Sequence, residues 1–260
     1  MNPDPSFFEI RLAQSEADLL AAQRMRYRVF IEELGGDGDM VDHERRLEMD
    51  EFDPIVDHLC LVDTRRSVED LDHVVGVYRL LPGDRAAAFG RFYCDSEYDM
   101  TPLRECGRKV LELGRSCIDP TLRGGAGILL LWNALAEYVL ARDIEILFGV
   151  ASFHGTDVHM LAPSLSWLHY NCLAPENLRP VARPEGFHRM DLIPQDRLDK
   201  REAMVGMPAL IKAYLRLGGL VGEGAYIDRK FNTTDVFLLM DTKVMSEKHR
   251  RYYESRRQDP

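Results

Sequence analysis

The stretch KVLELGRSCIDPTLRGGAGILLLWNALAEYVLARDIEILFGVASF, residues 109–153, decides the fold of this chain. Residues 109–120 read as an apolar strand that ends at an Asp-Pro pair. Five residues rich in glycine then lead into a segment with apolar residues at helical spacing, and residues 144–153 return as a second apolar strand. The order strand, glycine loop, helix, strand predicts a β-α-β unit with a right-handed crossover. The helix face that we expect to be buried consists of Ile128, Leu131, Trp132, Leu135 and Val139.

Strand-like and helix-like segments also precede this unit. FFEIRLA, residues 7–13, predicts a strand, and Ser15-x-x-Asp18 predicts the start of a helix that ends near Gly35. Residues 58–64 and 72–82 are two apolar runs separated by polar residues, which predicts a hairpin.

The segment beyond Cys172 adds further elements. PALIKAYLRLGG, residues 208–219, predicts an amphipathic helix, and DVFLLMD, residues 235–241, predicts a strand. The alternation of elements predicts an α/β or α+β fold. We expect a single domain over residues 1–260, with residues 173–260 as a C-terminal extension.

Composition excludes several classes of protein. With 45% hydrophobic and 29% charged residues, the chain is neither disordered, collagen-like nor a coiled coil. A formal net charge of -10 disfavours nonspecific binding to nucleic acid. The five cysteines are odd in number and never spaced C-x-x-C, so neither a disulfide framework nor a cysteine zinc site is indicated. These features favour a reducing cytoplasm.

The sequence also bears on membrane contact. Residues 1–18 lack the basic and apolar regions of a secretory signal, and the most apolar stretch, residues 124–141, is interrupted by Asn133 and Glu137. We therefore expect a cytoplasmic protein whose contact with the inner membrane, if any, is peripheral.

The loop RGGAG, residues 123–127, stands between a predicted strand and a predicted helix. Backbone N–H groups and the positive end of the helix can hold a phosphate there. On spacing alone, a tight turn that needs glycines explains the loop equally well. A Walker A loop is excluded because no Lys-Ser/Thr follows the glycines, and a Rossmann site is disfavoured because the unit does not open a repeated β-α-β-α-β pattern.

Strand, R-x-x-G-x-G/A-like loop and helix together resemble the cofactor-binding element of the GNAT acyltransferase superfamily. The resemblance implies a mixed, mainly antiparallel, twisted central sheet flanked by helices. It also implies that the loop grips the pyrophosphate of coenzyme A or the single phosphate of an acyl carrier protein, although the glycine register differs from the usual pattern. The resemblance assigns acyl-pantetheine binding to Arg123, Gly124, Gly125 and Gly127.

A second resemblance covers almost the whole chain. The acyl-homoserine lactone synthases, which are GNAT-like and use acyl carrier protein, share the order of Arg26, Phe30, Asp50, Asp53, Arg79, Glu112 and Arg115. The ornithine N-acyltransferases, also described as hemolysin-like, share this framework, and residues 57–63, 151–155, 208–219 and 224–241 resemble that family. The resemblance implies transfer of a 3-hydroxyacyl group from acyl carrier protein to the α-amine of L-ornithine. The product is then lyso-ornithine lipid, made in the first step of ornithine lipid biosynthesis, and no metal or redox cofactor is implied.

Three residues are candidates for the chemical step: Glu112, His154 and Arg115. Glu112 can accept a proton from the attacking ammonium, although an ion pair with Arg115 is the alternative and needs an irregularity in the strand. His154 can shuttle a proton or bond the thioester oxygen, whereas a lone histidine is more often structural. Ser152 stands in the same ASFHG motif and is assigned to substrate binding.

Asp50, Asp53, Asp57 and His58 form an acidic cluster in a loop-like stretch, suited to the two amines of ornithine. A divalent-cation site and a solvated face are the alternatives. Arg79 can pair with these aspartates or bind the substrate carboxylate. The resemblance adds Arg26 and Phe30 to the substrate site.

An acidic acyl carrier protein needs a local basic patch on this acidic chain. The candidates are Arg104, Arg108, Lys109, Arg115 and Arg123. The helix at residues 208–217 and the tail at 249–253 can touch an anionic membrane, although core packing explains the helix better. Three other functions remain open: a lactone synthase that uses S-adenosylmethionine, an enzyme that acylates glutamine or lysine, and a noncatalytic acyl-chain or membrane-binding protein.

Overall fold

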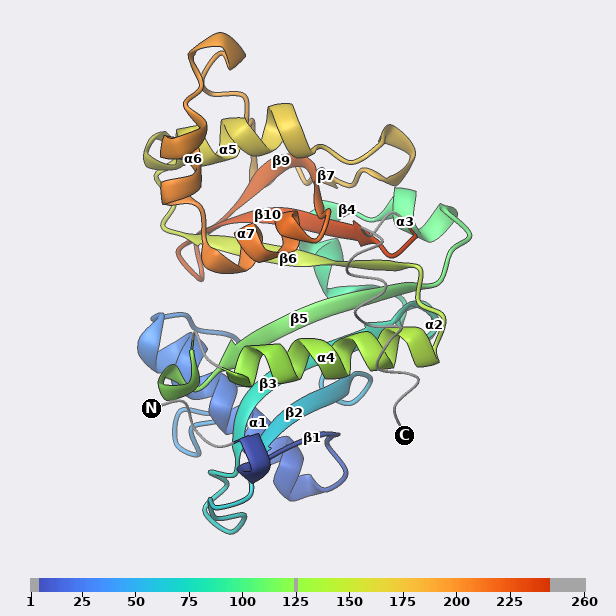
Figure 1. Ribbon diagram of the computed structural model, residues 1–260, viewed down its shortest axis with the longest axis vertical. Coiled ribbons are helices and arrows are strands. Elements are labelled where there is room, and N and C mark those ends of the chain that lie inside the picture. Colours follow the sequence, from blue (N-terminus) through green and yellow to red (C-terminus); the bar gives the residue numbers. More distant parts are fainter. Residues whose placement is uncertain (1–4, 124–125, 244–260) are drawn as a thin grey trace. The chain divides into compact units, whose positions relative to one another are not determined.

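The computed structural model describes residues 5–123 and 126–243, which belong to two compact units (Figure 1). The first unit comprises residues 1–89 and 113–143, and the second comprises residues 90–112 and 144–260. Strand β5 (Val110–Ile118) contributes residues to both units. The single domain over residues 1–260 stays a prediction.

The sheet of the first unit has the strand order β1-β2-β3-β5. β1 (Phe8–Leu12), β2 (Asp57–Asp63) and β3 (Val74–Pro82) pair antiparallel, which confirms the predicted first strand and hairpin. All nine residues of β3 are buried, because successive side chains point to opposite faces and helices cover both faces. The fold is therefore mixed α/β with mostly antiparallel strands.

Two helices sandwich this sheet. α1 (Glu16–Arg26) packs on one face against a cluster that includes Cys60, Val77 and Cys117. α4 (Ala126–Ala141) packs on the other face, where Leu131 meets Gly76. On α4, the predicted buried face is confirmed for Leu131, Leu135 and Val139, and Tyr138 joins them, whereas Ile128 and Trp132 are only partly buried.

The N-terminal helix changes its winding halfway along. Ser15 caps α1 by accepting a hydrogen bond from the N–H of Asp18, as predicted. After Arg26 the chain continues as a π-helix, η2 (Tyr27–Glu33), in which the N–H of Leu34 bonds the carbonyl of Val29 five residues back. The sequence predicted one regular helix, because the wider turn leaves no mark in the spacing of apolar residues.

The second unit has the strand order β5-β6-β10-β9-β7-β4, with β8 beside β9. The predicted parallel pair is confirmed: residues 110–112 of β5 lie beside residues 146–148 of β6 (Ile146–His154). β10 (Thr233–Asp241) pairs antiparallel with β6 over its full length, so the C-terminal segment supplies a strand of this sheet.

Strand β9 (Leu220–Asp228) is absent from the sequence-based expectations because glycines interrupt its apolar pattern. A Cβ at Gly222 would lie 2.7 Å from the carbonyl oxygen of Pro180, so this glycine permits close packing of backbones. α7 (Ala209–Arg216) buries Ile211 in the core and contacts β10, which confirms core packing for that helix.

No helix within the described ranges is long and apolar enough to cross a membrane.

Further helices and short strands complete the two units. The remaining elements are η1 (Pro5–Phe7), α2 (Gly83–Phe89), η3 (Tyr93–Ser96), β4 (Tyr98–Asp99), α3 (Thr101–Glu105), η4 (Pro120–Leu122), α5 (Val158–Cys172), η5 (Glu176–Leu178), β7 (Val181–Ala182), β8 (Phe187–His188), η6 (Gln195–Arg197) and α6 (Lys200–Gly206).

Candidate active site

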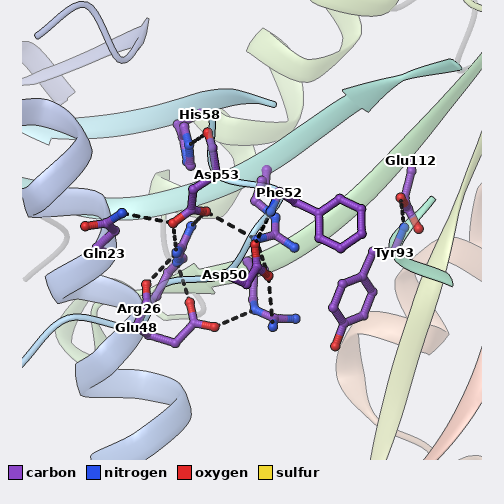
Figure 2. A network of polar contacts seen from close by, with 11 residues as sticks. Gln23, Arg26, Glu48, Asp50, Phe52, Asp53, His58, Tyr93 and Glu112 are labelled. Atoms are coloured by element: carbon purple, nitrogen blue, oxygen red, sulfur yellow. Dashed lines mark hydrogen bonds and ion pairs between the residues drawn. The ribbon is translucent and has the colours of Figure 1, made fainter. Parts of the chain in front are cut away.

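A network of charged side chains lies in the first unit, and Figure 2 shows its central members. α1, β3 and β5 each provide one arginine, and the segment between η2 and β2 provides three carboxylates. The members of this network are Arg26, Glu48, Asp50, Asp53, Arg79 and Arg115.

Arg26 is fully buried at the centre of the network. Its two Nη atoms bond the two oxygens of Asp53 at 2.8 and 2.7 Å, and its Nε lies 2.6 Å from Oε2 of Glu48. Burial alone would lower the pKa of Arg26, but the charges of Glu48 and Asp53 raise it. Burial would likewise raise the pKa of Asp53, but Arg26 and Arg79 hold it well below its usual value. Both groups are therefore charged.

The carboxylate of Asp53 also accepts hydrogen bonds from two other buried side chains. Nε2 of Gln23 donates to Oδ2 at 2.9 Å, and Nη1 of Arg79 donates to Oδ1 at 3.2 Å. His58, which is 5% exposed, has Nε2 3.1 Å from the carbonyl oxygen of Asp53. Burial and the charge of Arg26 lower the pKa of His58, so the neutral ring donates this bond. Asp53 and His58 therefore hold the network together.

Asp50 and Arg115 lie at the more exposed side of the network. Nη1 of Arg79 bonds Oδ2 of Asp50 at 2.6 Å, and Nη2 of Arg115 lies 3.4 Å from the same oxygen. The side chain of Asp50 is 18% exposed, compared with 3% for Glu48 and 5% for Asp53. Asp50 is thus the carboxylate that solvent reaches most easily.

Arg115 has an unusual backbone conformation. Its φ of 47° is left-handed, which interrupts the regular alternation of β5. An ion pair between Arg115 and Glu112 would need such an irregularity, but it is Oε1 of Glu48 that Nε of Arg115 bonds, at 2.9 Å. The guanidinium also stands 5.9 Å from the centre of the Phe30 ring. The structure thus joins Arg115 and Phe30 to the network that contains Arg26.

The predicted acidic cluster needs correction. Three carboxylates meet three guanidiniums, so the network has no surplus negative charge, and this pairing also disfavours a divalent-cation site. Asp57 and His58 belong to β2 and not to a loop. Asp57 bonds Arg85 and the hydroxyl of Tyr138, both at 2.7 Å, outside the network. Pairing of Arg79 with the aspartates is confirmed.

Sequence reasoning missed two members of the site. Gln23 precedes Arg26 by three residues on α1, so helical spacing could have placed it on the same face. Glu48 stands two residues before Asp50 and bridges Arg26 and Arg115, which no local pattern indicates.

The second unit holds the other catalytic candidates. Glu112 is 3% exposed, and its two oxygens accept hydrogen bonds from the N–H groups of Tyr93, at 2.9 Å, and Cys94, at 2.7 Å (Figure 2). These N–H groups stabilise the ionised carboxylate. Glu112 is also the last residue of β5 that pairs with β6. Ser152 and His154 are exposed and share one side of β6, because they are two residues apart.

The predicted acyl-pantetheine residues have separate environments. Arg123 forms a two-pronged ion pair with Glu33, and its Nε donates to the carbonyl oxygen of Ile118 at 3.3 Å. A Cβ at Gly127 would lie 2.8 Å from Cδ1 of Ile118, so packing requires this glycine. Gly124, Gly125 and the tail at residues 249–253 lie outside the described residues.

The arginines predicted to bind an acidic carrier protein have carboxylate partners within their own units. Arg104 pairs with Asp95, and Arg108 holds both oxygens of Asp241 at 2.6 Å. Arg115 pairs with Glu48, and Arg123 pairs with Glu33. These ion pairs reduce the positive charge that the four arginines could offer to a carrier protein. The basic patch stays a prediction.

Comparisons with known proteins agree with this picture. A model of the Acetyltransferase (GNAT) domain matches residues 25–133. The L-ornithine N(alpha)-acyltransferase of Rhodobacter capsulatus is 65% identical over 97% of this chain and 96% of its own length. The L-ornithine N(alpha)-acyltransferase of Brucella abortus is 39% identical over 94% of this chain and 88% of its own length.

Solved structures extend the likeness to the fold alone. An N-acyl amino acid synthase from uncultured soil microbes matches with a TM-score of 0.53 at 13% identity, covering 91% of this chain and 92% of that one. A CoA-dependent acyl-homoserine lactone synthase matches with a TM-score of 0.50 at 16% identity, covering 94% of this chain and 89% of that one.

Proposed function

We propose an activity from the premise that this chain belongs to the family of L-ornithine N(alpha)-acyltransferases. The enzyme transfers a 3-hydroxyacyl group from acyl carrier protein to the α-amine of L-ornithine and forms lyso-ornithine lipid. The observation that carries this proposal is the 65% identity over 97% of the chain. The 3-hydroxyacyl group and the carrier protein rest on the sequence resemblance.

The reaction makes modest demands on the protein, because a thioester is already activated. The ammonium of ornithine gives up one proton, its nitrogen attacks the thioester carbon, and the carbon–sulfur bond breaks as the amide forms. The nitrogen loses a second proton, and the departing thiolate takes up one proton to become the thiol of the carrier. The protein must position the amine and accept the first proton.

Glu112 and His154 are the two candidates for accepting that proton. Each oxygen of Glu112 accepts a hydrogen bond from a backbone N–H, so the carboxylate is held in a fixed position on β5. His154 is exposed at the end of β6 and needs no rearrangement to reach solvent. We propose Glu112 as the first choice for the proton acceptor, because the two backbone N–H groups favour its ionised form and only that form can accept a proton.

The first unit recognises the amino acid. Asp50 is the most exposed carboxylate of the charged network and contacts the substrate ammonium, while Arg79 and Arg115 beside it take up the substrate carboxylate. Arg26, Asp53 and His58 keep these groups in place, and Phe30 of the same unit also belongs to the proposed substrate site. The assignment of Ser152, which lies on β6 of the second unit, to substrate binding rests on its sequence motif alone. When the substrate binds, ion pairs between Asp50 and the two arginines are therefore replaced by ion pairs between these residues and the substrate.

Incubation of purified protein with 3-hydroxypalmitoyl acyl carrier protein and a panel of amines tests this proposal. The panel contains ornithine, lysine, glutamine and S-adenosylmethionine, and products are identified by mass. We expect an ornithine amide. A lactone would assign the chain to signal synthesis, a lysine or glutamine amide would change the substrate, and no product would favour a noncatalytic binding protein.

We infer a cytoplasmic place of action, because the five cysteines are odd in number and show no spacing of a disulfide framework, as expected in a reducing compartment. The product carries an acyl chain and partitions into the inner membrane, so peripheral contact suffices for its release.

A further inference from the structure

We propose that Glu33 sets the affinity of the enzyme for its acyl donor by occupying Arg123 until the phosphate of the donor displaces it. This inference rests on the proposed function and on the sequence resemblance, which assigns Arg123 to the phosphopantetheine arm of the donor. The two oxygens of Glu33 face Nη1 and Nη2 of Arg123, and the second contact measures 2.6 Å.

The geometry makes Glu33 a stand-in for a phosphate. A guanidinium presents two parallel N–H groups that suit carboxylate and phosphate alike. In Arg123 both groups are directed to Glu33, and Nε is directed to the carbonyl oxygen of Ile118. A phosphate that uses the same two groups must therefore replace the carboxylate.

The position of this ion pair makes replacement easy. The side chains of Arg123 and Glu33 are 41% and 37% exposed, and exposed ion pairs contribute little to stability. Glu33 is the last residue of the π-helix η2, and π-helical turns are frequent at functional sites. The carboxylate can turn into solvent without disturbing the buried network around Arg26.

Glu33→Gln tests the proposal, with Glu32→Gln as the matched control. Glu32 is the neighbouring residue of the same π-helix and pairs with Arg46, which is also exposed. Each variant removes one negative charge from one exposed ion pair. The donors are acyl-4'-phosphopantetheine and acyl-pantetheine, which differ only in the phosphate.

We expect Glu33→Gln to lower KM for the phosphorylated donor about two- to fivefold, the range that an exposed ion pair corresponds to. KM for acyl-pantetheine should not change, and Glu32→Gln should change neither value. An unchanged or higher KM for the phosphorylated donor, or an equal change for both donors, would overturn the proposal.

A binding measurement separates this inference from the proposed function. Calorimetric titration with 4'-phosphopantetheine should show tighter binding by Glu33→Gln than by wild type, whether or not turnover occurs. Equal affinities would contradict the role of Glu33. Tighter binding together with absent turnover on every amine would contradict only the proposed acyl transfer.

Discussion

Asp50 and Asp53 are three residues apart, and their surroundings give them different roles. Asp53 receives hydrogen bonds from Gln23, Arg26 and Arg79 and is 5% exposed, so it holds the structure together. Asp50 shares one oxygen between two arginines and is 18% exposed. Sequence position alone treats the two residues as equivalent.

Substitution of each aspartate by asparagine separates these roles. Asp53→Asn removes one of the two buried carboxylates that neutralise Arg26, so we expect a loss of about 3–5 kcal/mol in the free energy of unfolding. Asp50→Asn should cost about 1 kcal/mol and raise KM for ornithine about tenfold. Denaturant titration and steady-state kinetics measure these effects. A normal KM for Asp50→Asn would return this residue to a structural role.

The two candidate proton acceptors also differ in what their loss should do. Glu112→Gln places an amide NH₂ against one of two backbone N–H donors, so we expect a loss of about 1–3 kcal/mol in stability together with a fall in kcat. His154→Asn changes an exposed side chain and should leave stability within about 0.5 kcal/mol.

The decisive measurement is kcat per folded enzyme, with the folded fraction taken from thermal unfolding. Loss of a general base costs about 10²- to 10⁴-fold. We expect that loss for Glu112→Gln and less than a tenfold change for His154→Asn. The reverse order would transfer the proton to His154.

His58 makes stability depend on pH. Because its pKa is lowered in the folded protein, the unfolded chain binds a proton first as pH falls below about 6.5. This contribution to stability is fully present above that pH and is lost below it, by up to about 1.4 kcal/mol per pH unit. His58→Asn cannot titrate there and should lose less stability between pH 6.5 and 5.5. Parallel stability curves for the two proteins would show that His58 is not responsible.

At the scale of single elements, the start of α4 contains Gly127, a glycine that either close packing or ligand binding could require. Gly127 is buried, and a Cβ there would meet Ile118, Leu61 and Leu122. The glycine-rich pattern that resembles a phosphate-binding loop therefore also meets a packing requirement of the first turn of α4.

Gly127→Ala should consequently destabilise the protein even when no ligand is bound. We expect a loss of about 1–3 kcal/mol, because Cβ would lie 2.8 Å from a carbon of the core. Gly114→Ala is the control, since the nearest atom to its Cβ is 3.9 Å away. If both variants unfold at the same denaturant concentration, the packing explanation of Gly127 is wrong.

The elements themselves were predictable where hydrophobic patterns are strong. The hairpin β2–β3, the parallel pair β5–β6 and helix α4 follow from apolar runs and their spacing. The π-helix after Arg26 was not predictable, because a change in winding depends on backbone hydrogen bonds. β9 was missed because its glycines serve close contacts with other segments.

At the scale of the whole molecule, the sequence indicated which types of residue form the charged network. It did not indicate that the positive and negative charges of the network balance. Arg26, Asp53 and Arg79 were predicted members, yet the neutral network depends on Glu48, which bridges two arginines from distant segments. Such bridges form only when α1 and β5 meet in the folded unit. The assignment of function therefore rests on the family, and the chemistry of individual residues rests on the proposed tests.

The most direct test of the account is a competition between amino acids for one donor. Purified enzyme receives 3-hydroxypalmitoyl acyl carrier protein with equimolar ornithine, lysine and glutamine, and fragmentation by mass spectrometry identifies the product and its acylated nitrogen. The account predicts that N-alpha-acyl ornithine predominates. A predominant lysine or glutamine conjugate, an ornithine acylated on its side-chain nitrogen, or no acylated amino acid would contradict it.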